Sequence, residues 1–502
     1  MKRLQKRTPR HLPLIIFLLL ASTFYISSCT GDNKGEEGED LGGVETNTTS
    51  LDNDPAYASL FDMNPPHDVS STNPSDEELA IFAWREMIAL NWRSTYISSG
   101  SKNQRGTPDS TWSYTGTEPF PSQPVVWETY AHRTEFSPHN EQVPQKAFDT
   151  APIYTFGDKS YDGGSGSSAI FNCLDEDNEI GSCYLYALDP SDSLMLLYQA
   201  KTNRSEYDYV KKFKTKSNLA AAVTRTGNNV AKNNYYYEGN PTDNCSCPDS
   251  IVCLPCGEIN GDEGAIEIKT GWRKKFASET PADVAHFFHR KAIYFTEDGG
   301  VVSKHEDTFL LVGMHIIHKT VNMPEFIFAT WEHESLSKIG NPIYTYISQG
   351  IDKTDQKGTV KAVSRLHPVD SLFFEVSSNV HTLLAAKNPK SVWLNYNLTG
   401  VQAQIVSYAD RDSVSSYFLA NYAIESDILL QDFYGTFGNP QVITQNNILK
   451  VSEGKKYNMG GCKGCHGNAQ VGGADFSFII QAGDKDPDVY YSSFADAVKA
   501  AK

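Results

Sequence analysis

Positive charge is scarce in this chain of 502 residues. Lysine and arginine together number 44, against 61 aspartate and glutamate residues, which gives a formal net charge of −17. An acidic protein of this kind is a poor partner for nucleic acid or for an anionic membrane surface, and a basic redox partner protein would suit it better. Hydrophobic residues make up 39% of the chain, which is ordinary globular composition. The length allows a large core and more than one domain.

Several catalytic signatures are absent. The sequence contains no H-E-x-x-H zinc motif, no G-x-x-x-x-G-K-[ST] phosphate loop and no recognisable serine or cysteine catalytic order. The glycine-rich run at 162–168 lacks the G-x-S-x-G spacing of a nucleophile elbow. The sequence therefore gives no support to a metalloprotease, a nucleotide hydrolase or a hydrolase with a nucleophile elbow.

The N-terminus lacks an apolar run long enough for a comfortable membrane span. Basic residues at positions 2–10 precede an apolar stretch at 14–26, which ends in Ser27, Ser28 and Cys29. This order is typical of a secretory signal, and its end resembles a bacterial lipobox. Cleavage before Cys29 would leave that cysteine for lipidation, which anchors a protein firmly when several acyl chains are attached. An ordinary signal peptide with an incidental cysteine is the alternative.

The residues after Cys29 are too polar and glycine-rich to bury a core, so 29–70 is predicted to be a disordered acidic tether. Its acidic cluster resembles the signal that sends some lipoproteins to the outer face of the outer membrane, and a solvated spacer is the other interpretation. We expect an outer-membrane lipoprotein of the cell envelope, either periplasmic or surface-exposed.

The chain has nine cysteines. Cys173 and Cys183 bracket a short acidic loop, and four more crowd one loop: Cys245, Cys247, Cys253 and Cys256. In an oxidising compartment these six could form three disulfides, although the four-cysteine loop permits three different pairings. A zinc knot in that loop is the alternative.

The strongest motif lies near the C-terminus. Cys462 and Cys465 have C-x-x-C spacing, and His466 follows directly. This is the attachment signature of a c-type haem, in which two cysteines bind the porphyrin covalently and the histidine ligates the iron. A thioredoxin-type redox pair would need a preceding strand, but residues 451–459 are polar. We expect one covalent haem c per chain.

Helices and strands mingle without a regular alternation or repeat, so an α+β fold is predicted. A buried helix is expected to start at the capping residue Ser75 and to continue to Trp92. Further helices are expected at 203–217, 280–283, 413–433 and 492–500, and strands at 124–130, 153–156, 184–186, 194–198, 264–270, 308–318 and 324–333. The last two strands are apolar enough to be central, so polar groups on them, such as His315, must be paired or functional.

Four segments follow from these patterns: a lipoprotein signal peptide at 1–28, the tether at 29–70, an α+β body at 71–440 and a C-terminal haem segment at 441–502. The body is expected to have central strands and flanking helices. The small haem segment is expected to be helical, cytochrome-c-like and docked on the body.

Several phrases along the chain, together with the C-x-x-C-H motif, resemble a family of bacterial c-type cytochrome-like proteins. These phrases are at 82–92, 127–129, 203–206, 264–269, 313–320, 391–393 and 475–478. The resemblance spans about residues 75 to 480 and implies covalent haem and redox work, but no substrate.

The leading hypothesis is therefore a lipid-anchored monohaem cytochrome that transfers single electrons. A haem-dependent oxidoreductase, peroxidase-like or oxidising a small molecule, is the first alternative, since an electron carrier needs far fewer residues. A surface ligand-binding lipoprotein with an accessory haem is the second.

The sequence also lacks a nearby distal ligand. None of the residues after His466 is a methionine or a histidine, and Met459 is too close to the motif to reach round the ring. The haem segment is therefore expected to dock on the body, which either completes the iron coordination or leaves the site open. His315 is the first candidate, on the family resemblance. The others are Met314, His318, Met323 and His381.

Overall fold

The structure is a computed structural model. It describes residues 51, 53–96, 104–135, 146–150, 170–171, 184–186, 194–233, 245, 247–298, 301–337, 343–347, 359–363, 369–403, 419, 421, 424, 449–450, 456–457, 462, 466, 469–470 and 472–480. The predicted segments at 153–156 and 492–500 and nearly all of 413–433 lie outside these residues, as do Cys29, Cys173, Cys183 and Cys465.

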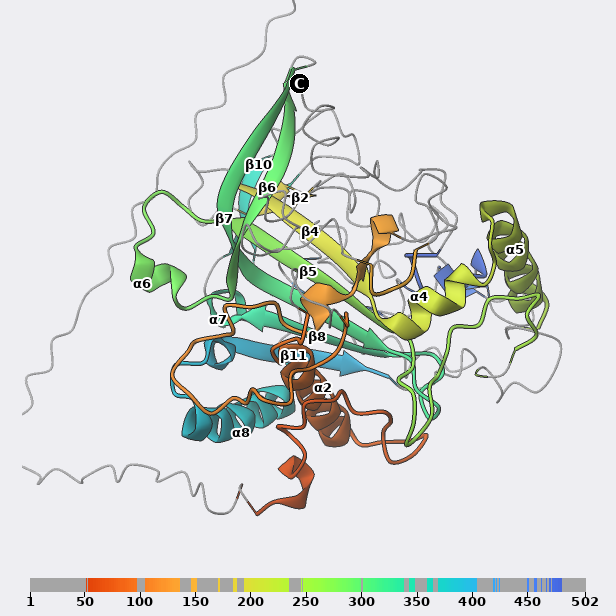
Figure 1. The fold of residues 1–502 in the computed structure, drawn as a ribbon, viewed down its shortest axis with the longest axis horizontal. Helices are drawn as coiled ribbons and strands as arrows, with labels where there is room; N and C mark the ends of the chain where they lie inside the picture. The colour runs from red at the N-terminus through yellow and green to blue at the C-terminus, as the bar shows by residue number, and fades with distance from the viewer. Residues whose placement is uncertain are drawn as a thin grey trace, which may run out of the picture. The chain divides into compact units, whose positions relative to one another are not determined.

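A mostly antiparallel sheet forms the centre of the protein (Figure 1). Five strands run side by side in the order β4 (Leu194–Thr202), β5 (Ile266–Lys274), β7 (Val301–His318), β8 (Ile327–His333) and β11 (Tyr396–Gln402). The first half of β7 pairs with β6 (His289–Asp298). The second half of β7 pairs with β8 along the same edge. Because β7 is so long, it contacts three neighbours and is the central strand.

Shorter strands extend this sheet. Beyond β4 lie β3 (Tyr184–Tyr186), β9 (Ile343–Ile347) and β10 (Thr359–Val363), while β1 (Ala131–His132) pairs with β4 and β2 (Ile170–Phe171) runs parallel to β6. A separate pair is formed by β12 (Leu449–Lys450) and β13 (Lys456–Tyr457).

The helices among the described residues are mostly short. The longer ones are α2 (Asp76–Leu90), α4 (Arg204–Lys211), α5 (Lys216–Asn233) and α8 (Ser371–Lys387), and the single turns are η1 (Pro55–Tyr57), η2 (Trp127–Thr129), η3 (Arg133–Glu135), α6 (Pro281–Val284), α7 (Glu334–Ser337) and η5 (Val392–Asn395). None of the helices in the described part of the chain has the length and apolarity needed to cross a bilayer. Mixed helices and an antiparallel sheet confirm the α+β body.

Helix α2 begins where the sequence predicts. The Ser75 hydroxyl accepts a hydrogen bond from the Glu78 amide at 3.1 Å, which satisfies one of the amides left without a partner at a helix start. The helix is buried on nearly every side because it lies between the sheet and α8. The Trp84 ring packs edge-on against Trp331 of β8 and donates to the Ser377 hydroxyl of α8 at 3.2 Å.

Helices α2 and α8 cover one face of the central strands (Figure 1). Paired residues on adjacent strands share a face, so this helix-covered face carries Met314, Ile316 and His318 of β7, together with Trp331 of β8. His318 Nδ1 lies 2.8 Å from Glu86 Oε1 of α2, and both side chains are almost completely buried. Trp127 of η2 also lies against this face, in contact with Trp272 of β5.

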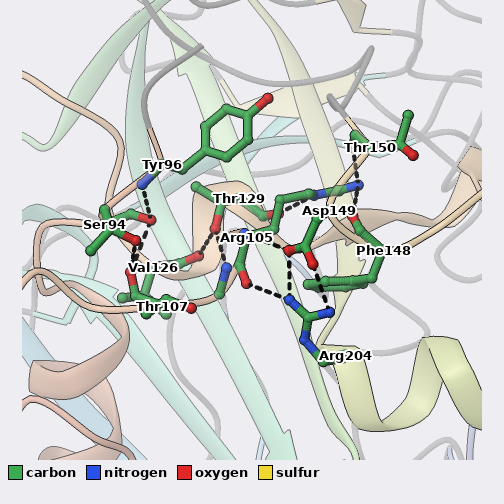
Figure 2. A network of polar contacts seen from close by, with 12 residues as sticks. Ser94, Tyr96, Arg105, Thr107, Val126, Thr129, Phe148, Asp149, Thr150 and Arg204 are labelled. Atoms are coloured by element: carbon green, nitrogen blue, oxygen red, sulfur yellow. Dashed lines mark hydrogen bonds and ion pairs between the residues drawn. The ribbon is translucent and has the colours of Figure 1, made fainter. Parts of the chain in front are cut away.

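A buried arginine organises those intervening loops (Figure 2). Arg105 forms an ion pair with Glu135 at 2.9 Å, and its guanidinium donates to four backbone carbonyl groups, of Thr129, Tyr130, Phe148 and Thr150. Arg204, the first residue of α4, pairs with Asp149 at 2.6 Å in the same network. Figure 2 shows how Arg105 and Arg204 converge on one loop, which fixes the start of α4.

The structure corrects three predictions. Residues 127–129 are a 3-10 turn rather than part of a strand, because the Glu128 carboxylate accepts the Val125 amide and closes the chain on itself. The predicted helix at 203–217 is two helices, separated at Lys214, which has φ 63°. The packed body begins before residue 71, since Tyr57, Leu60 and Val69 of the predicted tether are buried in the core.

Candidate haem site

The other face of the central strands is polar and also buried. It carries Glu267 and Lys269 of β5, His315 of β7, and Thr330 and Glu332 of β8, as the strand register places them. Four of these five are buried, Lys269 being partly exposed. We call this set the polar face. Buried polar side chains need partners, so whatever covers this face must supply them.

The histidine of the C-x-x-C-H motif lies over this polar face. The His466 ring is 5.1 Å from the ring of Phe328, which lies on β8 on the same face as Thr330. A second ring, Phe478, meets it edge-on at 4.9 Å. The motif histidine is therefore held between an aromatic residue of the body and one of its own segment.

One hydrogen bond fixes the orientation of the His466 imidazole. Its Nδ1 lies 2.6 Å from the backbone oxygen of Phe476. A carbonyl oxygen can only accept, so Nδ1 carries the proton, and in the neutral form of the ring the lone pair is at Nε2. Histidines that ligate a metal almost always donate their other ring N–H in this way. This geometry fits a ligating imidazole.

The first cysteine of the motif fits the same arrangement. Cys462 and His466 both have helical backbone. Cys462 is buried in the main core, and its thiol lies 3.7 Å from the backbone oxygen of Leu419. Cys462 and His466 would hold a haem together with Cys465.

A buried ion pair joins the motif's segment to the sheet. Lys319 follows the last residue of β7, and its Nζ lies 2.6 Å from Oδ2 of Asp475. Both side chains are fully buried. The amide of Leu254 donates to the same carboxylate oxygen. Burial lowers the pKa of Lys319, whereas the Asp475 charge acts to raise it.

Residues from four of the sequence phrases singled out above, 203–206, 264–269, 313–320 and 475–478, meet at this junction. Asn203 caps α4 by accepting the Glu206 amide at 3.2 Å, and its side chain donates to the Gly264 carbonyl at 2.7 Å. Lys319 donates its amide to the carbonyl of Ala265 at 2.9 Å. Residues from 203–206, 264–267, 319 and 475–477 thus form one connected polar cluster.

Glu206 and Glu267 form a carboxyl pair in this cluster. Burial raises the pKa of Glu206 well above its usual range, and the Glu267 carboxyl, which lies within hydrogen-bonding contact, adds to the shift. Asp475 also raises it through its charge. A hydrogen bond between two carboxyl groups requires a proton, so the pair shares one when the two carboxyls are bonded to each other. The Ser477 hydroxyl lies 3.5 Å from Glu206 Oε1 and connects the pair to the C-terminal segment.

The structure separates the candidate distal ligands. His315 lies on the polar face, diagonally across from Phe328, which contacts His466. Met314 and His318 lie on the helix-covered face. His381 belongs to α8, where its Nε2 lies 2.9 Å from the backbone oxygen of Tyr396. Met323 is buried in the loop between β7 and β8. Of the five, only His315 is placed by the strand register on the face that His466 covers.

The four-cysteine loop contains two disulfides, Cys245–Cys256 and Cys247–Cys253, with Cα–Cα distances of 5.4 and 5.9 Å. This pairing, which the sequence left open, replaces the zinc alternative. Among the described residues, no group of three or more histidine, cysteine, aspartate or glutamate side chains could hold a metal ion.

Comparison with protein-family models, with curated proteins and with solved structures gave no match to this chain.

Sequence reasoning missed the role of Asp475, Lys319 and Glu206. One feature of the sequence could have indicated the role of Lys319. It directly follows a long apolar strand, where a buried charge needs a partner. The partner lies 156 residues away, so local patterns could not identify it.

The carboxyl pair makes stability depend on pH. Because the folded-state pKa of Glu206 is raised, the folded protein binds this proton more tightly than the unfolded chain, and stability is lost as pH rises above the ordinary value of 4.5. We expect Glu206→Gln, which mimics the protonated form, to gain free energy of unfolding relative to wild type as pH rises, by at most about 1.4 kcal/mol per pH unit. Urea denaturation across the pH range measures this.

The matched control is Asp208→Asn, which removes an exposed carboxylate from the same helix. It should follow the wild-type pH profile. Parallel profiles for wild type and Glu206→Gln would show that Glu206 is ionised in the folded protein.

Proposed function

We propose that this chain is a lipid-anchored monohaem c-type cytochrome that transfers single electrons at the cell envelope. The observation that carries the proposal is the hydrogen bond from His466 Nδ1 to the Phe476 carbonyl, within an intact C-x-x-C-H sequence. Cys462 and Cys465 would hold the porphyrin, and His466 would ligate the iron through Nε2. The bound haem would supply a centre that gains and loses one electron.

The body contributes three things to this function. Phe328 packs on the His466 ring, the Lys319–Asp475 pair joins the C-terminal segment to the sheet, and the polar face carries His315 diagonally across from Phe328. A basic protein is the expected redox partner, since the chain has a net charge of −17.

A haem-dependent oxidoreductase is the second candidate. The observation that favours it is the polar face, where Glu267, His315 and Glu332 are buried. An electron carrier does not need such groups, whereas a distal reaction site uses them.

Covalent attachment is the first prediction. Protein made with a cytochrome c maturation system should keep its red pigment after denaturation and acid–acetone extraction, because thioether bonds survive both. In Cys462→Ala/Cys465→Ala the pigment should pass into the organic phase. Absorbance of the two phases measures this.

The control for that experiment is Cys245→Ala/Cys256→Ala, which removes two cysteines that form a disulfide. It should keep the pigment in the protein phase. Extraction of the pigment from the wild-type protein would refute the proposed function.

Lipid anchoring is the second prediction. Wild-type protein should enter the detergent phase in a detergent phase separation, and Cys29→Ala should stay unlipidated and enter the aqueous phase. The matched control is Cys173→Ala, which leaves Cys29 intact and should behave as wild type. Wild-type protein in the aqueous phase would contradict the lipobox assignment.

The third prediction concerns the sixth coordination position. If His315 completes the coordination, His315→Ala should change the iron from low spin to high spin and let it bind carbon monoxide. Met314→Leu, which changes the neighbouring residue on the helix-covered face with nearly conserved volume, should leave the spectrum unchanged. Visible absorption with and without carbon monoxide measures both.

A low-spin spectrum in His315→Ala would exclude His315 as the ligand. A wild-type haem that is already high-spin and binds carbon monoxide would favour the oxidoreductase over the electron carrier.

A further inference from the structure

The turn that holds His466 in place is strained. Asp475 has φ 52° and Phe476 has φ 63°, so two consecutive residues other than glycine adopt the left-handed conformation. This conformation is unfavourable for an L-amino acid, although aspartate tolerates it better than phenylalanine does. Such strain persists only where the surrounding structure enforces it, and it concentrates at functional sites.

The strain has a direct geometric result. Phe476 is the residue whose carbonyl accepts the His466 Nδ1–H at 2.6 Å. The left-handed backbone at 475 and 476 therefore determines where this carbonyl points.

Asp475 is the residue through which the body enforces the turn. Its Oδ2 accepts from Lys319 Nζ at 2.6 Å and from the Leu254 amide, which come from two different parts of the body. The turn is tightened locally by the Ala474 amide, which donates to Ala469 at 2.8 Å, and by the Ser477 amide, which donates to Ala474 at 3.0 Å.

Close packing just before the turn leaves little room for it to shift. Gly473 has φ +91°, and a Cβ on it would lie 2.0 Å from the Val223 carbonyl oxygen and 2.4 Å from the Gly227 amide nitrogen of α5. The backbone at Gly473 therefore packs directly against the backbone of α5, with no room for a side chain. The Phe476 ring packs at 6.4 Å from both Phe326 and Phe328 on the other side.

We propose that Asp475 is a positioning residue for the axial histidine: anchored by Lys319, it holds the strained turn that keeps the Phe476 carbonyl on His466 Nδ1. The inference rests on the proposed function in that His466 is taken as the iron ligand. It goes further because it makes the body, rather than the C-x-x-C-H motif alone, responsible for the electronic character of that ligand.

The expected effect follows from ligand chemistry. A carbonyl that accepts the Nδ1 proton strengthens the electron donation of the imidazole through Nε2, which favours the ferric state. Loosening this hydrogen bond should move the midpoint potential to more positive values and expose the Nδ1 proton to exchange with solvent.

The test is Asp475→Asn in the full-length haem protein. Asparagine accepts the left-handed conformation, so the substitution removes the charge on the anchor while it leaves the turn sterically allowed. The matched control is Glu325→Gln, which removes another carboxylate that acts on Lys319 but lies outside the turn. Redox titration gives the midpoint potential, and proton NMR gives the exchange rate of the His466 Nδ1 proton in heavy water.

We expect Asp475→Asn to keep its covalent haem, to shift the midpoint potential upward and to exchange the Nδ1 proton at least tenfold faster, while Glu325→Gln keeps the wild-type exchange rate. Equal exchange rates in wild type and Asp475→Asn would overturn the inference and leave the proposed function standing. An upward potential shift of equal size in both variants, without faster exchange, would also overturn it, since charge alone would then explain the shift.

A buried lysine without its partner could unfold the protein, so the second variant is Lys319→Gln/Asp475→Asn, which leaves neither charge. It should show the same faster exchange as Asp475→Asn, and wild-type exchange in this double variant would count against the inference. Absence of covalent pigment in the wild-type protein would instead overturn the proposed function, and the inference with it.

Discussion

A sheet that is buried on both faces while one face is polar needs a partner for every charge on that face. In this protein two such partners come from outside the sheet. Helix α4 supplies Glu206 opposite Glu267, and the C-terminal segment supplies Asp475 to Lys319. A buried ammonium group that loses its carboxylate costs about 3–5 kcal/mol, which is a large share of the stability of a typical domain. The C-terminal segment is therefore part of the body's own electrostatic balance and is not an independent appendage.

The same constraint explains the shape of the segment around the motif. Its route is fixed at three points: Gly473 against α5, Asp475 on Lys319, and Phe476 between the aromatic rings of the β7–β8 region. With these three contacts in place, the carbonyl of Phe476 points toward His466. Strain in the turn is the consequence of satisfying the buried charge and the imidazole at once.

Local sequence patterns predicted the helix caps and the central strands well. They did not predict the contacts between the C-terminal segment and the sheet. The cap at Ser75, the central strands around 308–333 and the short helix at 281–284 depend on neighbours a few residues away, and the structure confirms them. Helix α8 was missed although its buried apolar residues, Phe373, Val376, Val380, Leu383 and Leu384, recur at helical spacing. The disulfide pairing, the 3-10 turn at 127–129 and the contact of Lys319 with Asp475 depend on residues brought together by folding, so no spacing in the sequence specifies them. The haem motif itself is recognisable from sequence, but its docking surface is not.

The large body has a physical purpose in this arrangement. In a small self-contained cytochrome, the residues after the motif provide the distal side of the haem, but here no methionine or histidine follows His466. The polar face instead provides a buried surface. On it, His315 of β7 lies diagonally across from Phe328 of β8, and Glu332 lies on the same face of β8 as Thr330. If haem is bound as proposed, the sheet would decide through His315 whether the iron is closed or left open to a ligand. Under the proposed function, electron transfer and oxidoreductase chemistry would differ by the occupancy of a single position on the iron, for which β7 supplies the candidate ligand His315.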